Sequence, residues 1–309
     1  KKSLNKNQAI DLGIFDEAHR TATVKQKIDS NFNFALFDKN IKIKKRLFMT
    51  ATRRILSTKQ LDSTGSGKLL VSMDNEKLYG KICYNLSFFE AAKKYKAIAR
   101  PKIILSEVLS SEIDDYRTQN SSTDVKGEKI KSDYLATQIS LKKAIKKKKI
   151  NKVFCFHNTV PHSKNFTEGD KPESIGFHLK DFYTDFVSGS MRMNLRDKKM
   201  QLFKSSKKAI ISNARCLIEG VDVPTVGMVS FVSPKKSEID IVQAIGRSLR
   251  NRSDPKKKYG YIHIPIFIKK YKNQSLADAV DNSNFDNLIM IIKALREHDD
   301  EINQILENI

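Results

Sequence analysis

Residues 12–20 have the sequence LGIFDEAHR, which indicates a strand followed by titratable side chains. A short apolar run, Leu12–Phe15, is typical of a buried strand, and it leads directly into Asp16, Glu17 and His19. In open α/β sheets, ligands bind outside the carboxyl ends of the strands. One carboxylate placed there can hold Mg²⁺ through water while its neighbour deprotonates an attacking water, as nucleotide hydrolysis requires. An isolated acidic pair is equally compatible with a solvated strand end, so the interpretation depends on the rest of the chain.

Along the rest of the chain, short apolar strands alternate with helical patterns, which indicates α/β units around a parallel sheet. The predicted strands are Leu12–Phe15, Leu47–Met49, Val153–Phe156, Ala209–Ile211, Met228–Val232 and Tyr261–Phe267. The predicted helices include Tyr134–Lys147 and Asn194–Phe203. With 309 residues, the chain is long enough for two domains, and we expect two.

The charge balance points to a polyanionic partner. Lys and Arg number 57 against 35 Asp and Glu, which gives a formal net charge of +22. Such an excess is typical of nucleic-acid-binding proteins, although a basic, lysine-rich surface would give the same number. The run Lys142–Lys149 is interpreted as the exposed end of a helix before the strand at Val153, with solvation as its main role.

Cysteine usage and hydropathy restrict the class of protein further. The three cysteines, Cys83, Cys155 and Cys216, show neither a pairing pattern nor a metal-ligand spacing, and each is expected to act as a small hydrophobe. We therefore expect a reducing compartment, the cytoplasm, and no zinc site. No apolar run reaches membrane-spanning length, so no membrane partner is expected.

Four further segments follow the acidic pair in order along the chain. RLFMTATRR (46–54) is a strand that ends in small hydroxyl residues, and KVFCFHNT (152–159) is a strand that runs into polar residues. IISNARCLIEGVDVP (210–224) is a strand followed by a bend, and DIVQAIGRSLR (240–250) is a helical pattern that carries two arginines.

The order DEAH, TAT, EGVDVP and QAIGRSLR resembles motifs II, III, V and VI of superfamily 2 helicases and translocases. The stretches SMDNEKLYGKICYNLSFFEAAKKYKA and FDNLIMIIKALREHDDEI extend the resemblance to predicted helicases related to type I and type ISP restriction-modification motors. The resemblance implies two RecA-like α/β domains with ATP and Mg²⁺ between them. Residues 1–94 would be the C-terminal part of domain 1, residues 95–270 the whole of domain 2, and residues 271–309 a helical extension.

The resemblance also assigns roles in the first domain. Asp16 would hold the Mg²⁺ shell, and Glu17 would be the catalytic base for water attack. His19, Thr50 and Thr52 would couple the nucleotide site to the nucleic-acid site. We therefore expect Asp16, Glu17 and the Thr50–Thr52 segment to lie at neighbouring strand ends of one partial sheet.

In the second domain, Gln243 would help to position the attacking water, and Arg247 and Arg250 would approach the γ-phosphate. A spacing of three residues predicts that these arginines share one helix face, and Gly246 would permit the close approach of another backbone. Gly220 would allow a tight bend, and Asp222 would bond the ribose or the arginines.

Three polar residues are candidates for contacts with a nucleic-acid backbone. They are Asn158, Asn213 and Arg215. Each is equally compatible with a turn-forming role.

One element of the family pattern is missing. The phosphate-binding G-x-x-x-x-G-K-[ST] loop should precede Asp16, and STGSGKLL (63–70) does not replace it because Asp62 and Leu69 break the pattern. We therefore expect this chain to be part of a longer protein and, alone, to bind ATP poorly and hydrolyse little.

The C-terminal segment is more acidic than the rest. Phe285, Leu288, Ile289, Ile292 and Leu295 fall at helical spacing after Ser283, a candidate N-cap. We expect a helix that packs its apolar face on the second domain, and a coupler to a nuclease, methyltransferase or specificity module is the alternative.

Two functions from different classes therefore remain open. The first is an ATP-driven helicase or translocase that acts on double-stranded DNA, with RNA as an alternative substrate. The second is a nucleic-acid-binding scaffold that has a motor fold without ATPase activity. The sequence leaves the direction of movement open.

Overall fold

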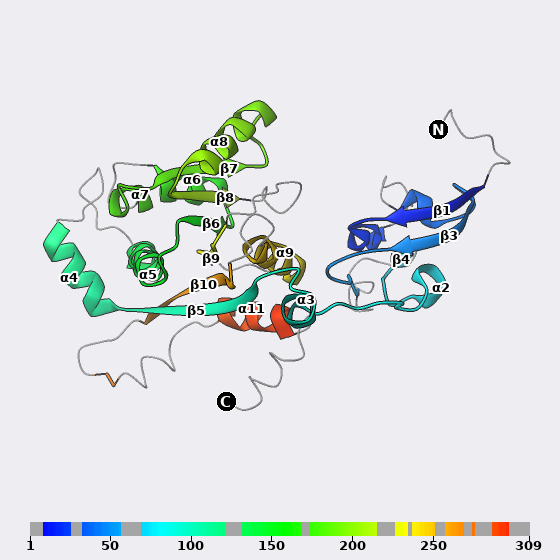
Figure 1. Cartoon of the computed structure of the whole chain (residues 1–309), viewed down its shortest axis with the longest axis horizontal. Helices are drawn as coiled ribbons and strands as arrows, with labels where there is room; N and C mark the ends of the chain where they lie inside the picture. Colours follow the sequence, from blue (N-terminus) through cyan, green and yellow to red (C-terminus); the bar gives the residue numbers. More distant parts are fainter. Residues whose placement is uncertain are drawn as a thin grey trace. The chain divides into compact units, whose positions relative to one another are not determined.

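The computed structural model describes residues 9–25, 33–56, 69–120, 132–168, 174–214, 226–233, 237–250, 257–268, 274–275 and 286–296 (Figure 1). The chain divides into two compact units, Lys1–Asn85 and Leu86–Ile309. The fold is α/β with parallel sheets, as predicted. No described helix is both long enough and apolar enough to cross a membrane.

The first unit is built on two parallel strands. Its described elements are β1 (Ile10–Phe15), the 3-10 helix η1 (Ala18–Thr21), β2 (Thr23–Lys25), the 3-10 helix η2 (Phe34–Leu36), β3 (Ile43–Phe48), β4 (Leu69–Val71) and α2 (Glu76–Tyr79). Strand β1 pairs with β3 in parallel, and β2 pairs with β4 in antiparallel. The predicted strands at Leu12 and Leu47 therefore exist and are neighbours.

Partly buried aromatic side chains pack against the small core of the first unit, which contains Ala18, Ala22 and Met73. Phe15 and Phe48 stack with ring centroids 4.8 Å apart, and Tyr79 of α2 lies 4.9 Å from Phe48. The Tyr79 hydroxyl lies 2.7 Å from Thr21 Oγ1. Burial raises the pKa of Tyr79, and the hydrogen bond with Thr21 opposes that effect. The core thus ties η1, which follows Glu17, to the carboxyl ends of β1 and β3.

The second unit contains a wholly parallel sheet with the strand order β5-β10-β9-β6-β8-β7. The strands are β5 (Arg100–Leu109), β6 (Lys152–His157), β7 (Tyr183–Ser188), β8 (Ala209–Ala214), β9 (Met228–Phe231) and β10 (Tyr259–Ile268). The described helices are α3 (Phe88–Lys93), α4 (Ser110–Asn120), α5 (Ser132–Lys148), α6 (Val160–Thr167), α7 (Ile175–His178), α8 (Met193–Ser205), α9 (Glu238–Leu249) and α11 (Asp286–Arg296).

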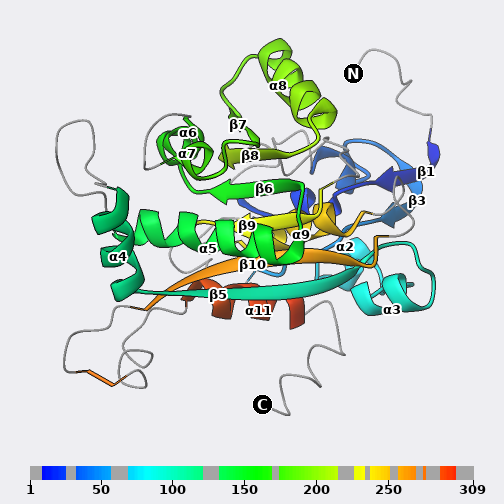
Figure 2. The ribbon, with the colours of Figure 1, turned by 60° about the vertical axis from the view of Figure 1, so that its left-hand side comes forward.

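Helices cover both faces of this sheet, as parallel sheets require (Figure 2). One core lies under α5, α6 and α7 and includes Leu141, Phe166 and Ile175. The other lies under α8, α9 and α11 and includes Phe203 and Ile245. Every residue of β6, β8 and β9 is buried, which explains why their sequences are almost continuously apolar.

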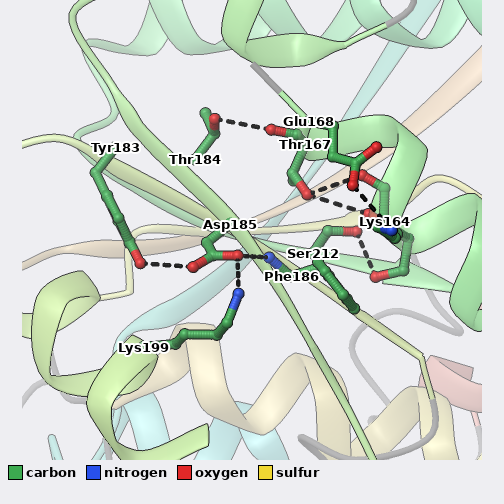
Figure 3. Close-up of polar contacts among 10 residues, drawn as sticks. Lys164, Thr167, Glu168, Tyr183, Thr184, Asp185, Phe186, Lys199 and Ser212 are labelled. Carbon is green, nitrogen blue, oxygen red and sulfur yellow. Dashed lines mark hydrogen bonds and ion pairs between the residues drawn. The ribbon is translucent and has the colours of Figure 1, made fainter. Parts of the chain in front are cut away.

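The edge strand β7 is tied to a helix on each face of the sheet (Figure 3). The Asp185 carboxylate accepts a hydrogen bond from the Tyr183 hydroxyl at 2.8 Å and pairs with Lys199 of α8. On the other face, the Thr184 hydroxyl donates to the Thr167 carbonyl of α6 at 3.1 Å. Burial and the adjacent carboxylate of Asp185 raise the pKa of Tyr183. These bonds fix both helices against a strand that has only one neighbour in the sheet.

The predicted C-terminal helix is present and packs on the second unit. Ile291 and Leu295 of α11 are fully buried in the core that also contains Ile241 and Ile245 of α9. The predicted apolar face is wrong at Ile289, which is 47% exposed because it lies on the outer side of the helix. Ser283 and Phe285 lie outside the described residues.

The cysteines differ in their surroundings. Cys155 is buried in β6, and burial raises the pKa of its thiol. Cys83 is exposed, so the expected apolar surroundings are wrong at that position. Cys216 lies outside the described residues.

Candidate functional site

The acidic pair and the Thr-Ala-Thr segment meet at the carboxyl ends of β1 and β3. Backbone hydrogen bonds of 2.9 Å run from Met49 N to the Phe15 carbonyl and from Ala18 N to the Met49 carbonyl. Asp16 and Glu17 thus follow one strand, and Thr50 follows its neighbour. The predicted placement of these residues at adjoining strand ends is confirmed.

Side chains connect the two strand ends in a polar chain. His19 Nδ1 lies 3.0 Å from Thr50 Oγ1 and 3.3 Å from Glu17 Oε2. Since the Thr50 hydroxyl donates its one proton to the Thr52 carbonyl at 2.9 Å, His19 Nδ1 must be the donor to Thr50. His19 and Thr52 are buried, so the chain links a part-exposed carboxylate to a buried residue in the otherwise exposed loop after β3. The structure therefore brings together Glu17, His19, Thr50 and Thr52.

The backbone of Glu17 is left-handed, with φ 49° and ψ 45°. A residue with a side chain adopts this conformation at a cost of about 1–2 kcal/mol, and such positions cluster at functional sites. The conformation turns the chain sharply out of β1, which lets Ala18 N reach the Met49 carbonyl. The Asp16 side chain supports the turn by accepting a 2.9 Å hydrogen bond from Glu17 N.

The donor set at this strand end suits a nucleotide-bound Mg²⁺. Asp16 is exposed and the Glu17 side chain is 41% exposed, so both carboxylates are accessible. The described residues contain no group of three or more acidic, histidine or cysteine side chains arranged to hold a metal. Mg²⁺ in nucleotide sites is held by one or two carboxylates together with water and phosphate oxygens, which Asp16 can satisfy.

The helix α9 carries Gln243, Arg247 and the residue before Arg250. It begins after Ser237, whose hydroxyl accepts a 3.3 Å hydrogen bond from Asp240 N. The helix ends at Leu249, and Arg250 is its C-cap with extended backbone angles, φ −60° and ψ 129°. The expectation that both arginines share one helix face is therefore wrong, because Arg250 has already left the helix.

A different glycine from the predicted one allows close packing here. A Cβ added to Gly246 would meet no described atom within 4 Å, so the expected close approach of a backbone is not found at this position. A Cβ added to Gly260 of β10 would lie 2.4 Å from the Ser248 carbonyl oxygen. Gly260 thus lets the end of α9 rest directly on β10, and its place at the start of an apolar run was the available sequence signal.

The end of α9 lies at the amino ends of β5 and β10. Ala99 N, just before β5, donates to the Leu249 carbonyl at 2.7 Å. Lys257, just before β10, donates to the Arg250 carbonyl at 2.9 Å and to the Val226 carbonyl at 2.5 Å. Sequence reasoning missed Lys257 because it lies in a run of lysines. The backbone of Arg250 is thus held at the edge of the sheet opposite to the one where parallel-sheet ligands normally bind. Arg247 lies about one turn earlier in α9 and is buried, with 6% of its surface exposed.

The nucleic-acid candidates are placed differently from one another. Asn158 is exposed just beyond the carboxyl end of β6. Asn213 is fully buried in β8, and its side-chain amide donates to the Cys155 carbonyl at 3.0 Å. This burial argues against direct contact of Asn213 with nucleic acid and indicates a structural role. Arg215, Gly220 and Asp222 lie outside the described residues.

Comparisons with known proteins agree with this geometry. Residues 136–252 match the family described as helicase conserved C-terminal domain, a span that includes Gln243 and both arginines. The "Putative ATP-dependent helicase IRC3" of Saccharomyces cerevisiae is 28% identical over 187 residues, which are 55% of this chain and 27% of that protein. "Putative helicase 22" of a Sulfolobus islandicus filamentous virus (isolate Iceland/Hveragerdi) is 29% identical over 75 residues, 24% of this chain and 13% of that protein.

Among solved structures, similarity is seen to an "ATP-dependent Type ISP restriction-modification enzyme LlaBIII bound to DNA". The TM-score is 0.69 with 26% identity, over 96% of this chain and 20% of that one. The chain therefore has a RecA-like helicase fold, and its residues 136–252 match the helicase conserved C-terminal domain. It spans about a quarter or less of the length of each of these proteins.

Proposed function

We propose that this chain is the later part of an ATP-driven motor that translocates along, or unwinds, double-stranded DNA. The observation that carries the proposal is the polar chain from Glu17 through His19 to Thr50, which joins the ends of two neighbouring strands. A solvated acidic strand end would need no such connection to the buried Thr52 after the neighbouring strand. A motor does need one, because hydrolysis at one site must change contacts at another.

In the first unit, Glu17 acts as the base that orients and deprotonates the attacking water, and Asp16 holds the Mg²⁺ shell through water. Bound Mg²⁺ neutralises charge on the phosphates during transfer. Through its hydrogen bonds, His19 transmits a change in the charge or position of the Glu17 carboxylate to Thr50 and Thr52. The left-handed backbone at Glu17 holds its carboxylate in one orientation, which favours a fixed attack geometry.

In the second unit, Arg247 and Arg250 act as arginine fingers. Guanidinium is planar and permanently charged, and it can donate two hydrogen bonds to phosphate oxygens. The backbone of Arg250 lies at the amino edge of its own sheet, where that sheet itself would not bind a nucleotide. This position therefore favours donation to a nucleotide that is held by residues outside this sheet. Gln243 helps to position the attacking water.

Charge and similarity to known proteins both favour double-stranded DNA as the substrate. The chain carries a formal net charge of +22. The similar type ISP enzyme is described as bound to DNA, and the similar yeast protein as an ATP-dependent helicase. The phosphate-binding loop is expected in residues that precede Asp16 in the natural protein, and nuclease or methyltransferase modules are further candidate partners.

The test is the steady-state ATPase rate of the full-length natural protein with and without duplex DNA. We expect DNA to stimulate turnover, and Glu17→Gln to bind nucleotide while turnover falls by about 10²–10⁴-fold. Glu76→Gln, at an exposed glutamate in the same unit, is the control and should retain the parent rate. If Glu17→Gln hydrolyses ATP at the parent rate, the motor hypothesis is wrong and a nucleic-acid-binding scaffold takes its place.

A further inference from the structure

A group of lysines gathers at the amino ends of the strands of the second unit. They come from the end of α5, the end of α8 and the residues just before β7 and β8. This group, called the amino-edge lysine cluster, consists of Lys146, Lys149, Lys180, Lys204, Lys207 and Lys208. Lys208 is half-buried, and the other five are exposed.

The sheet register brings these segments together. Ala209 N donates to the Asn151 carbonyl at 2.8 Å, and Tyr183 N donates to the Lys208 carbonyl at 3.0 Å. Lys208 therefore lies between the starts of β6 and β7, and neighbouring strands are about 4.8 Å apart. Lys149 ends the turn after α5, with a left-handed backbone at φ 53°. Segments that are distant in sequence thus form one continuous edge.

One carboxylate pairs with a lysine of the cluster and lies within the electrostatic range of another. Asp181 pairs with Lys208 at 2.6 Å. This hydrogen bond, with a smaller contribution from the charge of Lys146 on α5, holds the pKa of Asp181 below its ordinary value. Aromatic rings support two of the stems, since Lys208 Nζ lies 5.6 Å from the Phe182 ring and Lys180 Nζ lies 5.8 Å from the Phe177 ring.

Most of the positive charge in this cluster is not neutralised. Among the described residues, no carboxylate lies within 4.0 Å of the ammonium groups of Lys146, Lys149, Lys180, Lys204 or Lys207. The nearby Glu168, at the end of α6, pairs with Lys164 of its own helix at 3.2 Å.

Neighbouring lysines on α5 and β6 are partly or largely buried, and their pKa values are lowered. Burial, and then the charge of Lys146, lowers the pKa of Lys142, and burial lowers the pKa of Lys152. Lys152 extends beneath the cluster and donates to the Lys204 carbonyl at 2.6 Å.

Solvation of a helix end accounts for only part of this arrangement. A helix C-terminus favours cations in its last turn, which explains Lys146 on α5 and Lys204 on α8. It does not explain Lys180, Lys207 and Lys208, which lie in the turns that precede β7 and β8. At the carboxyl ends of β6, β7 and β9, the described residues 157–159, 188–190 and 231–233 include no lysine or arginine.

We propose that the amino-edge lysine cluster is a second nucleic-acid-binding surface, which contacts the phosphate backbone of duplex DNA independently of sequence. Lysine provides compact point charges rather than the planar fork of arginine, and this favours phosphate contact over base recognition. The surface lies opposite the carboxyl end of β6, where Asn158 is found, so it is distinct from the nucleic-acid contacts of the proposed function. It takes nucleic acid as the partner from that proposal but uses none of the same residues.

The test is duplex binding by the 309-residue chain, measured by fluorescence anisotropy over a range of NaCl concentrations. The variant is Lys146→Ala/Lys180→Ala/Lys207→Ala, which leaves the Lys208 ion pair and the buried Lys152 intact. The control is Lys93→Ala/Lys198→Ala/Lys293→Ala, which removes three exposed lysines from α3, α8 and α11 of the same unit. Circular dichroism melts check that both variants fold.

Each phosphate contact contributes about 0.9 to the slope of log K against log salt concentration. For the cluster variant, we expect the magnitude of this slope to fall by about 2–3 and the affinity at low salt to fall by about tenfold or more. For the control, we expect the slope to change by less than about 1. Equal slopes for the two variants would overturn the inference, as would an absence of duplex binding at low salt. Binding of polyglutamate in place of duplex DNA would overturn the choice of partner.

These outcomes are separate from those of the proposed function. If DNA does not stimulate ATP turnover but the cluster variant shows the expected decrease in the salt slope of duplex binding, the second nucleic-acid-binding surface is supported and the motor function is not. If DNA stimulates ATP turnover but the cluster variant and the control have equal salt slopes, the motor function is supported and this surface is not.

Discussion

His19 Nδ1 donates a 3.0 Å hydrogen bond to Thr50 Oγ1 and thereby joins the carboxyl ends of β1 and β3. The same nitrogen lies 3.3 Å from Glu17 Oε2, and the Thr50 hydroxyl donates a hydrogen bond to the Thr52 carbonyl. Four polar groups thus form one connected path. In the proposed motor, this path transmits the state of the catalytic carboxylate to the loop after β3.

Thr50→Val should uncouple ATP hydrolysis from DNA binding. Valine keeps the shape of threonine but removes all three hydrogen bonds of the hydroxyl, with His19, the Thr52 carbonyl and Thr52 N, so His19 loses its partner after β3. In the full-length protein, we expect DNA stimulation of turnover to fall by about tenfold while turnover without DNA stays within about twofold, a change of about 1–2 kcal/mol in coupling. The measurement is the ATPase rate at saturating ATP with and without duplex DNA.

The matched control for this variant is Thr23→Val, at a half-buried threonine of β2 in the same unit. It should leave both rates unchanged. If Thr50→Val is stimulated by DNA as strongly as the parent, the polar chain is structural and does not couple the sites.

Arg250→Ala should reduce ATP turnover by about 10³-fold or more, the contribution typical of an arginine finger. Arg250→Lys should restore little of this loss, because an ammonium group cannot reproduce the bidentate fork. Arg192→Ala, at an exposed arginine just before α8, is the control. The measurement is the ATPase rate together with nucleotide affinity, and substantial rescue by lysine would show that Arg250 contributes only charge.

Gly260→Ala and Gly246→Ala should change stability in opposite directions. The new Cβ at position 260 would lie 2.4 Å from the Ser248 carbonyl oxygen, and relief of this clash requires α9 to shift from β10. We expect a loss of about 1–3 kcal/mol in the free energy of unfolding, as for other overpacked sites. Position 246 is open and helical, so alanine there should add about 0.5–1 kcal/mol.

Chemical denaturation of the two alanine variants measures both effects. Because the end of α9 carries the arginines, Gly260→Ala should also lower ATP turnover in the full-length protein. Equal stability of the two variants would mean that α9 is not held by close packing on β10.

The sequence was informative where residue order and the rules of parallel sheets agree. Apolar runs with polar ends predicted the inner strands, and the strand-end rule predicted that Glu17 and Thr50 would be neighbours. The edge strand β5, RPKIILSEVL, was not predicted, because Pro101, Lys102 and Glu107 interrupt its apolar residues. An edge strand tolerates such residues because it has a free side.

Predictions were wrong where the spacing of residues along the sequence was used to infer their positions in the structure. A separation of three residues places two arginines on one face only while the helix continues, and α9 ends between Arg247 and Arg250. No proline or glycine follows immediately to mark that end. Likewise, Asn213 reads as a polar strand end, but β8 extends to Ala214 and encloses it.

Acid should destabilise the second unit through His263. Its Nδ1 lies 2.8 Å from the Ser230 hydroxyl, the residue is fully buried in β10, and burial lowers its pKa from 6.5 to about 3. The folded state therefore holds His263 neutral, whereas the unfolded state binds a proton below about pH 6.5. The stability that follows from this difference is fully present above pH 6.5 and is lost progressively as the pH falls from 6.5 toward 3.

One pH unit in this window changes the free energy of unfolding by up to about 1.4 kcal/mol for a single group. We expect the double variant His263→Leu/Ser230→Ala, which removes both members of the buried pair, to lose less stability between pH 7 and pH 5 than the parent. His162→Gln, at an exposed histidine of α6, is the control and should follow the parent. Urea unfolding at both pH values measures the difference, and parallel losses in the parent and the double variant would mean that another group governs the acid sensitivity.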